Sequence, residues 1–197
     1  MSRTLYTIGH SNHPLEHFIA LLKRHGIDCV CDVRSHPYSR RFPHFGREAL
    51  QRALQRQGVD YQFLGNELGA RPRDPSLYVN GCVDFEHVAA TVPFRDGLRQ
   101  LAAAMQNHHS AILCAERDPI TCHRMILVAR AIASSDVQVQ HILADSQIET
   151  NEEAEKRLMY SLGIAHDDLF ADHDALSAEA YSRQAQRIAY RGPGPSH

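Results

Sequence analysis

The sequence predicts an α/β protein: a three-layer, Rossmann-like sandwich in which helices cover both faces of a mostly parallel, five-stranded sheet. Two observations support this fold class. Short runs of apolar and β-branched residues alternate along residues 4–143 with longer stretches that have helical apolar spacing. Glycine, proline and asparagine separate these runs, which is typical of parallel strands joined by crossover helices.

Five strands are expected at residues 4–9, 29–33, 60–64, 111–114 and 137–143. The first helix should start after Asn12 and Pro14, and Gly26 should end it. The second helix should cover residues 46–57. Two stretches are expected to be irregular, residues 34–45 and 73–83.

The next helix is expected at residues 84–106, with a break at Pro93 because proline cannot donate a helical hydrogen bond. Asp118 and Pro119 have the residue types of an N-cap and a first helical turn. They should therefore begin the helix that carries residues 125–133.

Beyond Ala144 the chain becomes strongly charged. Helices are expected at residues 150–163 and 176–190, with an acidic stretch at 167–174 between them. We expect three parts: an α/β domain with the site at 1–145, a helical extension of that domain at 146–190, and a disordered tail at 191–197. The helical extension is a candidate contact for a second copy of the chain.

Composition excludes several classes of protein. The 197 residues, 43% of them hydrophobic, suffice for a proper core. An odd number of cysteines, five, and the lack of a signal-peptide pattern indicate a reducing cytoplasm. No apolar run approaches the roughly 18–20 residues that cross a bilayer, so no membrane partner is expected. The net charge of −2 argues against wrapping of nucleic acid by a bulk positive field, but it allows a local basic cleft.

Reactive side chains follow four of the five predicted strands. In an open parallel sheet, ligands bind at the carboxyl ends of strands, where helix N-termini also point. We therefore expect a functional cleft at this edge. Its candidate residues are His10, Ser11, Asp32, Arg34, Ser35, Ser39, Arg40, Glu67, Arg71, Cys114, Glu116, Cys122, His123 and Arg124.

The segment from Cys114 to Arg124 has the densest chemistry and allows two interpretations. Cys114, Cys122 and His123, with Glu116, have the side-chain types that bind zinc or iron, although their spacing is not a standard zinc pattern. Alternatively, Cys122 lies in the first turn of a helix beside two cationic residues, which would make it a nucleophilic thiolate. Cys114 could instead be an ordinary buried strand residue.

Arginines form a second group of candidates. Guanidinium groups bind phosphate or carboxylate through two hydrogen bonds, so they favour a phosphate-bearing small molecule or a nucleic acid as substrate. The expected substrate-binding residues are Ser11, Asp32, Arg34, Ser35, Ser39, Arg40, Arg71 and Arg124, with Arg41 and Arg47 as extensions. The expected catalytic residues are Cys122, His123, Glu116, His10 and Glu67. Any single arginine could instead pair with Asp32 or Glu67 and tie loops together.

Four motifs together resemble the domain of unknown function 488 family: TIGHSN at residues 7–12, DVRSHPYSR at 32–40, LGNELGARP at 64–72 and CAERDPITCHR at 114–124. The resemblance covers about residues 4–143. It implies a bacterial or archaeal α/β protein whose site is built from these motifs, and it implies no established reaction. Ala70 stands where the family usually has a second glycine.

The function expected from these features is an enzyme, with a metal ion such as zinc or iron, that acts on a phosphate-bearing substrate. A binding module without catalysis is the first alternative, and a thiol or sulfurtransferase-like protein that uses Cys114 and Cys122 is the second. The rhodanese-type comparison is weak because an anion cradle needs backbone amides and an arginine about five residues after the cysteine. Here Pro119 contributes no amide, and Ile120 is the sixth residue after Cys114.

Overall fold

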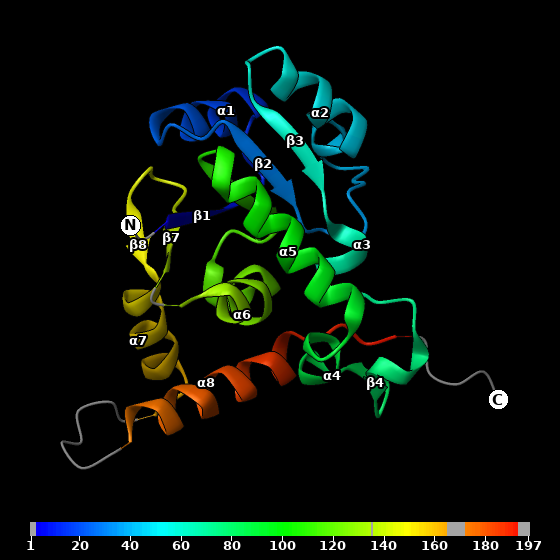
Figure 1. The fold of residues 1–197 in the computed structure, drawn as a ribbon, viewed down its shortest axis with the longest axis vertical. Coiled ribbons are helices and arrows are strands. Elements are labelled where there is room, and N and C mark those ends of the chain that lie inside the picture. Colours follow the sequence, from blue (N-terminus) through cyan, green and yellow to red (C-terminus); the bar gives the residue numbers. More distant parts are fainter. Residues whose placement is uncertain (1–2, 135, 165–171, 193–197) are drawn as a thin grey trace.

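The computed structural model describes residues 3–134, 136–164 and 172–192 (Figure 1). Its main sheet has six strands in the order β3-β2-β6-β1-β7-β8. They are β1 (Arg3–Gly9), β2 (Cys29–Asp32), β3 (Asp60–Phe63), β6 (Ser110–Cys114), β7 (Val137–Ile142) and β8 (Ile148–Thr150). All neighbours are parallel except β7 and β8, which are antiparallel. The predicted α/β class and mostly parallel sheet are confirmed, but the sheet has six strands and not five.

Helices pack against both faces of this sheet. The described helices are α1 (Leu15–Arg24), α2 (Arg47–Gln55), α3 (Gly65–Leu68), α4 (Phe85–Ala89), α5 (Val92–Asn107), α6 (Arg130–Ile132), α7 (Asn151–Ser161) and α8 (His173–Ile188). Successive strand residues enter opposite cores: Val30 joins the cluster with Leu50 of α2, whereas Cys31 joins the cluster with Leu101 of α5. Because both faces of the central strands β2 and β6 are buried, these two strands appear in the sequence as largely apolar runs.

Two short β elements differ from the expectation. The stretch at residues 73–83, expected to be irregular, contains a hairpin of β4 (Tyr78–Val79) and β5 (Cys82–Val83). Strand β8 was also missed, because three residues are too few to establish a period of two. Both errors concern strands that depend on their partners for stability.

The break in the predicted helix at 84–106 lies before Pro93, not at it. Helix α4 ends at Ala89, and the hydroxyl oxygen of Thr91 then accepts a hydrogen bond from the Phe94 amide at 3.2 Å. Pro93 is therefore in the first turn of α5, where a missing N–H is tolerated.

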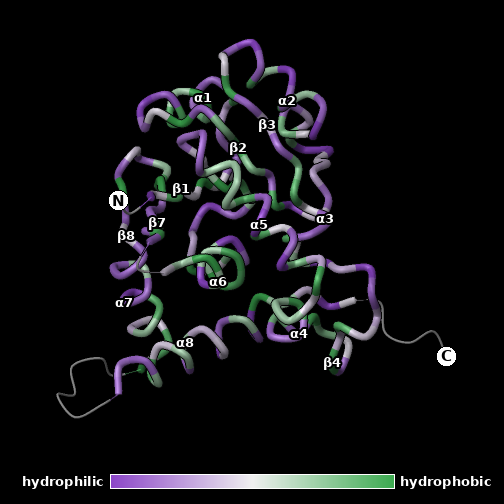
Figure 2. Tube along the Cα trace, viewed as in Figure 1, coloured by the Kyte–Doolittle hydropathy of each residue, from purple (hydrophilic) through white to green (hydrophobic). Residues whose placement is uncertain are grey.

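The segment after Asp118 also differs from a single helix. A 3₁₀ turn (Pro119–Thr121) comes first, Cys122 is extended, and a fully buried π-helix (Arg124–Ala129) then continues into α6. The prediction that Cys122 lies in a first helical turn is thus wrong, because Cys122 immediately precedes the helix. Figure 2 shows a mostly hydrophobic stretch of chain at α6, in agreement with the burial of the π-helix that leads into it.

The charged helices beyond residue 144 begin with clear capping groups. Thr150 and Glu153 form a reciprocal capping box at the start of α7, and Asp172 caps α8. Arg191, expected in the tail, instead forms a β-bridge with Cys82. The remaining tail, residues 193–197, and part of the acidic stretch, residues 167–171, lie outside the described residues. Within the described ranges, no helix has the length and apolar character needed to span a membrane.

Candidate functional site

A cleft of about 630 Å³ lies at the carboxyl edge of the parallel strands. Loops that follow β1, β2 and β6 contribute most of its wall. Nine of the fourteen candidate residues line it: His10, Ser11, Arg34, Ser35, Ser39, Arg71, Cys114, Glu116 and His123. The other five, Asp32, Arg40, Glu67, Cys122 and Arg124, are not part of its lining.

Four side chains with metal-binding atoms converge at one end of this cleft. Ligand atoms of Cys114, Glu116, Cys122 and His123 all lie within 4.8 Å of one another. Both thiols donate to the same Glu116 oxygen, Cys114 at 2.9 Å and Cys122 at 3.0 Å. Cys114, Cys122 and His123 are buried, whereas Glu116 is exposed. The cluster therefore has a buried base and one ligand open to solvent.

The His123 ring is oriented by the backbone of β2. Its Nε2 lies 3.1 Å from the Val33 carbonyl oxygen, which can only accept, so Nε2 carries the proton in the neutral ring. Nδ1 then faces the cluster and lies 3.4 Å from the Cys114 sulfur. Metal-binding histidines commonly have this arrangement, in which the second nitrogen donates to a fixed acceptor.

The two thiols differ in acidity. Burial, together with neighbouring Cys122, raises the pKa of Cys114 well above its ordinary value. Burial also disfavours the Cys122 thiolate, but the hydrogen bond from Cys114 and the charges of Arg124 and His123 outweigh it and hold the Cys122 pKa well below normal. Burial alone would lower the His123 pKa, but the hydrogen bond to Cys122 and the charge of Cys122 raise it above its ordinary value. Cys122 is therefore the more acidic thiol of the pair.

Arg124 supports the cluster from beneath. Its fully buried guanidinium donates to the carbonyl oxygens of Glu116 at 2.6 Å and Arg117 at 3.0 Å, and to the Thr7 hydroxyl at 3.3 Å. The loop comes so close to β1 that a Cβ on Gly9 would lie 1.8 Å from the Glu116 carbonyl oxygen. Arg124 was expected to contact substrate, but the structure places it in the support of this loop.

Asp32 and Arg34 form a buried ion pair beside the cleft. Arg34 donates from Nε at 2.9 Å and from a terminal nitrogen at 2.6 Å to the two Asp32 oxygens, and it also donates to the Phe45 carbonyl at 2.9 Å. The Tyr61 hydroxyl donates to Asp32 at 2.6 Å. Most donors of Arg34 are thus occupied, and Asp32 orients Arg34 rather than a ligand.

His10 lines the cleft as a neutral base. Its ring stacks on Phe45 with 4.3 Å between centroids, and Nδ1 lies 2.9 Å from the Ser11 carbonyl oxygen. Burial and the charge of Arg34 lower the His10 pKa to about 4. Its Nε2 therefore offers a lone pair and no charge at neutral pH.

The remaining candidates differ in position. The hydroxyl oxygens of Ser35 and Ser39 accept hydrogen bonds from the backbone amides of Arg71 and Phe42, so both stabilise loops. Glu67 lies on α3, where its Cβ would be 2.7 Å from a Cβ on Gly97 of α5, and it does not enter the cleft. Arg40 is exposed outside the lining.

Some lining residues were not among the primary candidates. They include His36, Tyr38, Arg41, Phe42, Ile188 and Tyr190. The Arg71 guanidinium lies over the Tyr190 ring, 4.5 Å from its centroid. Tyr190 could not be found from a local motif, because it reaches the cleft from the end of α8. Arg41 was detectable as part of the basic loop after β2.

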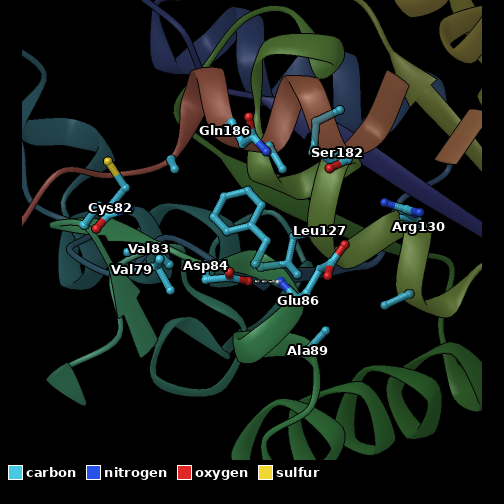
Figure 3. Close-up of a pocket in the computed structure, with 16 residues that line it drawn as sticks. Val79, Cys82, Val83, Asp84, Glu86, Ala89, Leu127, Arg130, Ser182 and Gln186 are labelled. Atoms are coloured by element: carbon cyan, nitrogen blue, oxygen red, sulfur yellow. Dashed lines mark hydrogen bonds between the residues drawn. The ribbon is translucent and has the colours of Figure 1, made fainter. Parts of the chain in front are cut away.

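A second cavity of about 610 Å³ lies between the β4–β5 hairpin, α4, α6 and α8 (Figure 3). Its lining is largely small and apolar, with Asp84, Glu86 and Arg130 as charged members. The Asp84 carboxylate is already occupied, since it accepts hydrogen bonds from the Glu86 and His87 amides and caps α4. This cavity has no converging reactive groups comparable to those of the first.

The helical extension holds the loop that precedes Cys122. Arg157 of α7 donates two hydrogen bonds of 2.8 Å to Asp118, whose carboxylate caps the 3₁₀ turn by accepting from the Ile120 amide. Gln184 of α8 donates to the Ile120 carbonyl oxygen at 2.7 Å. The extension therefore positions the cysteine loop.

We expect Arg157→Ala to increase amide hydrogen exchange at residues 120–122 roughly fivefold, because it removes about 1 kcal/mol of local stabilisation. Lys156→Ala is the matched control, since among the described residues Lys156 forms an ion pair only with exposed Glu152 on the same helix. Exchange would be followed by mass spectrometry of the native protein. Equal exchange in the two variants would contradict a clamping role for Arg157.

The fold and the site define an α/β protein with a Cys, Glu and His cluster at the carboxyl edge of its sheet. The family model described as Domain of unknown function DUF488 matches residues 14–131, more than half of the chain, and the chain belongs to this family. The match includes the whole cluster but neither His10 nor the helical extension. Comparisons with curated proteins and with solved structures gave no significant match.

Proposed function

We propose that the protein is an enzyme that binds a transition metal ion, such as zinc or iron, and acts on a phosphate-bearing substrate in the adjacent cleft. The observation that carries this proposal is the convergence of four ligand atoms within 4.8 Å at the end of that cleft. Two sulfurs, one imidazole nitrogen and one carboxylate oxygen form a donor set that suits zinc or iron.

The distances in the cluster support tetrahedral binding. Metal–ligand bonds of about 2.0–2.3 Å place neighbouring ligands roughly 3.5 Å apart. The Cys114 sulfur and the His123 nitrogen are 3.4 Å apart, and the two sulfur–carboxylate contacts are shorter, at 2.9 and 3.0 Å. A small rotation of exposed Glu116 would complete the set, while the three buried ligands already form a Cys₂His base.

The charge of the surroundings also favours this site. A divalent ion with two thiolates and one carboxylate has a formal charge of −1. Arg124 is fully buried, and its guanidinium donates only to uncharged oxygens among the described residues. A buried charge without a counter-charge is costly, and a metal–thiolate cluster would supply that counter-charge.

The cleft supplies the means to bind an anion. Exposed Arg41 and Arg71 line the cleft, and Arg34, which is paired with Asp32, also lines it. Such groups hold phosphate oxygens by charge and by paired hydrogen bonds. His10 adds a neutral acceptor for a substrate proton. A metal ion held by Cys114, Cys122 and His123 would act as a Lewis acid when a substrate oxygen replaces exposed Glu116 as the fourth ligand.

A thiol-dependent activity is the second candidate, favoured by the low pKa of Cys122 beside the protonated thiol of Cys114. In this case Cys122 is a nucleophile, and metal binding is not required.

Metal content separates these candidates. We expect close to one zinc or iron per chain in protein purified without chelator and without oxygen, and at least a tenfold decrease in Cys122→Ser. Cys82→Ser is the matched control, since Cys82 is a free, half-buried cysteine outside the cluster, and it should retain the metal. Loss of metal from both variants, or none in the parent protein after incubation with Zn²⁺, would reject the metal centre. Rapid alkylation of Cys122 in the metal-free parent would then support the thiol candidate.

Catalysis requires its own test. Metal-loaded protein would be incubated with nucleoside mono-, di- and triphosphates and with short oligonucleotides, and the products followed by ³¹P NMR and chromatography. Conversion that disappears in Cys122→Ser supports an enzyme. If the protein binds one of these compounds but does not convert it, the result would support a binding module without catalysis.

A further inference from the structure

We use the name cationic rim for five arginines: Arg41 and Arg71, which line the cleft, and Arg40, Arg47 and Arg117, which lie outside its lining on segments that follow β2 and β6. These arginines follow the carboxyl ends of β2, β3 and β6, and all of them are exposed. Glu116 is the sole acidic side chain in the described lining of the cleft. In a protein of net charge −2, the rim is therefore a local positive surface.

The charge of this rim is held in place without being neutralised. Within the described residues, none of the five rim arginines has an ion pair with a carboxylate. Three of them lie over aromatic rings instead: Arg41 over Phe42, Arg47 over Phe63 and Arg71 over Tyr190. Stacking on a ring orients a guanidinium and leaves its charge available to an anion.

Tyr38 adds an exposed aromatic ring to the same cleft. It lines the cleft and is 76% exposed. Exposed aromatic rings among cations are the means by which proteins stack unpaired bases. Bases inside a duplex are already stacked and cannot occupy such a ring.

The size of the surface indicates a chain rather than a single nucleotide. The cleft, at about 630 Å³, has the volume of a small-molecule pocket. Exposed Arg40 adjoins the lining residues Ser39 and Arg41 in the chain but lies outside the lining, so positive charge is also present beyond the space that one nucleotide would fill.

We propose that the substrate is single-stranded nucleic acid, with one unpaired nucleotide in the cleft, the neighbouring phosphates on the rim arginines and a base on Tyr38. This inference rests on the proposed function, because it names the substrate of the same cleft. Recognition by the rim is independent of the metal, so the two proposals can be tested separately.

The test uses fluorescence anisotropy with a fluorescein-labelled 12-mer of deoxythymidine at low and moderate salt. Tyr38→Ala should weaken binding about tenfold. Arg40→Ala/Arg41→Ala should also weaken it and reduce the slope of log affinity against log salt by about 1.4, or 0.7 for each lost contact. Tyr160→Ala and Arg183→Ala are matched controls, since Tyr160 is 79% exposed on α7 and Arg183 is exposed on α8.

Retention of affinity by both controls supports the proposal. Absence of binding at low salt, or equal weakening by Tyr38→Ala and Tyr160→Ala, would overturn it. Equally strong competition by heparin or by duplex DNA would also overturn it, because it would indicate unspecific attraction of polyanions. Oligonucleotide binding by metal-free Cys122→Ser would support the inference even if the parent protein binds no metal. Metal binding without oligonucleotide binding would overturn the inference and retain the proposed metal centre.

Discussion

Asp32→Ala should lower the free energy of unfolding by about 3–5 kcal/mol, because it leaves a buried charge without its partner. The Asp32 carboxylate is fully buried and accepts hydrogen bonds from Arg34 and from the Tyr61 hydroxyl. Urea denaturation measures the change. Asp60→Ala, on exposed Asp60 of the neighbouring strand, is the control and should have an effect below about 1 kcal/mol.

A double variant makes this test sharper. Asp32→Leu with Arg34→Met removes both charges, so it should be less destabilising than the sum of the two single variants. Additive effects would show that the two side chains contribute independently and that no buried ion pair stabilises the loop after β2.

Acidification from about pH 7.5 to about pH 5 should reduce the free energy of unfolding by about 2 kcal/mol for each of two buried histidines. Burial and the charge of Arg124 hold the pKa of His141 at about 3, and burial and Arg34 hold that of His10 at about 4, below the ordinary 6.5. Between these values the unfolded chain binds protons that the folded protein does not. Stability is therefore lost as the pH falls through 6.5, and the loss continues down to each folded pKa.

His141→Asn isolates one of the two contributions. Asparagine can still form a hydrogen bond to the Thr7 hydroxyl, which lies 2.8 Å from Nδ1 of His141. The variant should lose about 2 kcal/mol less than the parent protein over the same pH range. His87→Asn, at an exposed histidine, should behave like the parent. Identical pH profiles for His141→Asn and the parent would mean that His141 titrates normally.

Much of the fold follows from local pattern. Strands β2 and β6 are buried on both faces, so their apolar runs stand out, whereas β3 and β7 contain polar residues and positions that are only partly buried. Strand β8 and the β4–β5 hairpin have two or three residues per strand and exist only through pairing, which no local pattern contains. The 3₁₀ turn and the π-helix around Cys122 likewise depend on tertiary packing.

The candidate site likewise has some features that local sequence pattern predicts and others that depend on tertiary packing. Residue type and topology predicted nine of the side chains that line the cleft at the sheet edge, and they singled out the Cys114 to His123 segment. They could not distinguish an arginine that faces ligand from one that supports a loop, because the acceptors of Arg124 are backbone oxygens whose positions depend on the loop path. Tyr190 lines the cleft because of long-range packing. Glu67 lies against α5, where Gly97 allows the two helices to approach closely.

The position of β1 within the sheet affects how the protein acquires its fold. Tyr6 lies opposite Ala111 and Arg3 opposite Val137, so both neighbours of β1 are more than 100 residues further along the chain. During synthesis this apolar strand stays unpaired until both neighbouring strands, β6 and β7, have been made. Such high contact order slows folding and prolongs the exposure of an aggregation-prone segment. The reactive cluster begins at the end of β6, so its support by Thr7 and Gly9 of β1 depends on the same long-range pairing.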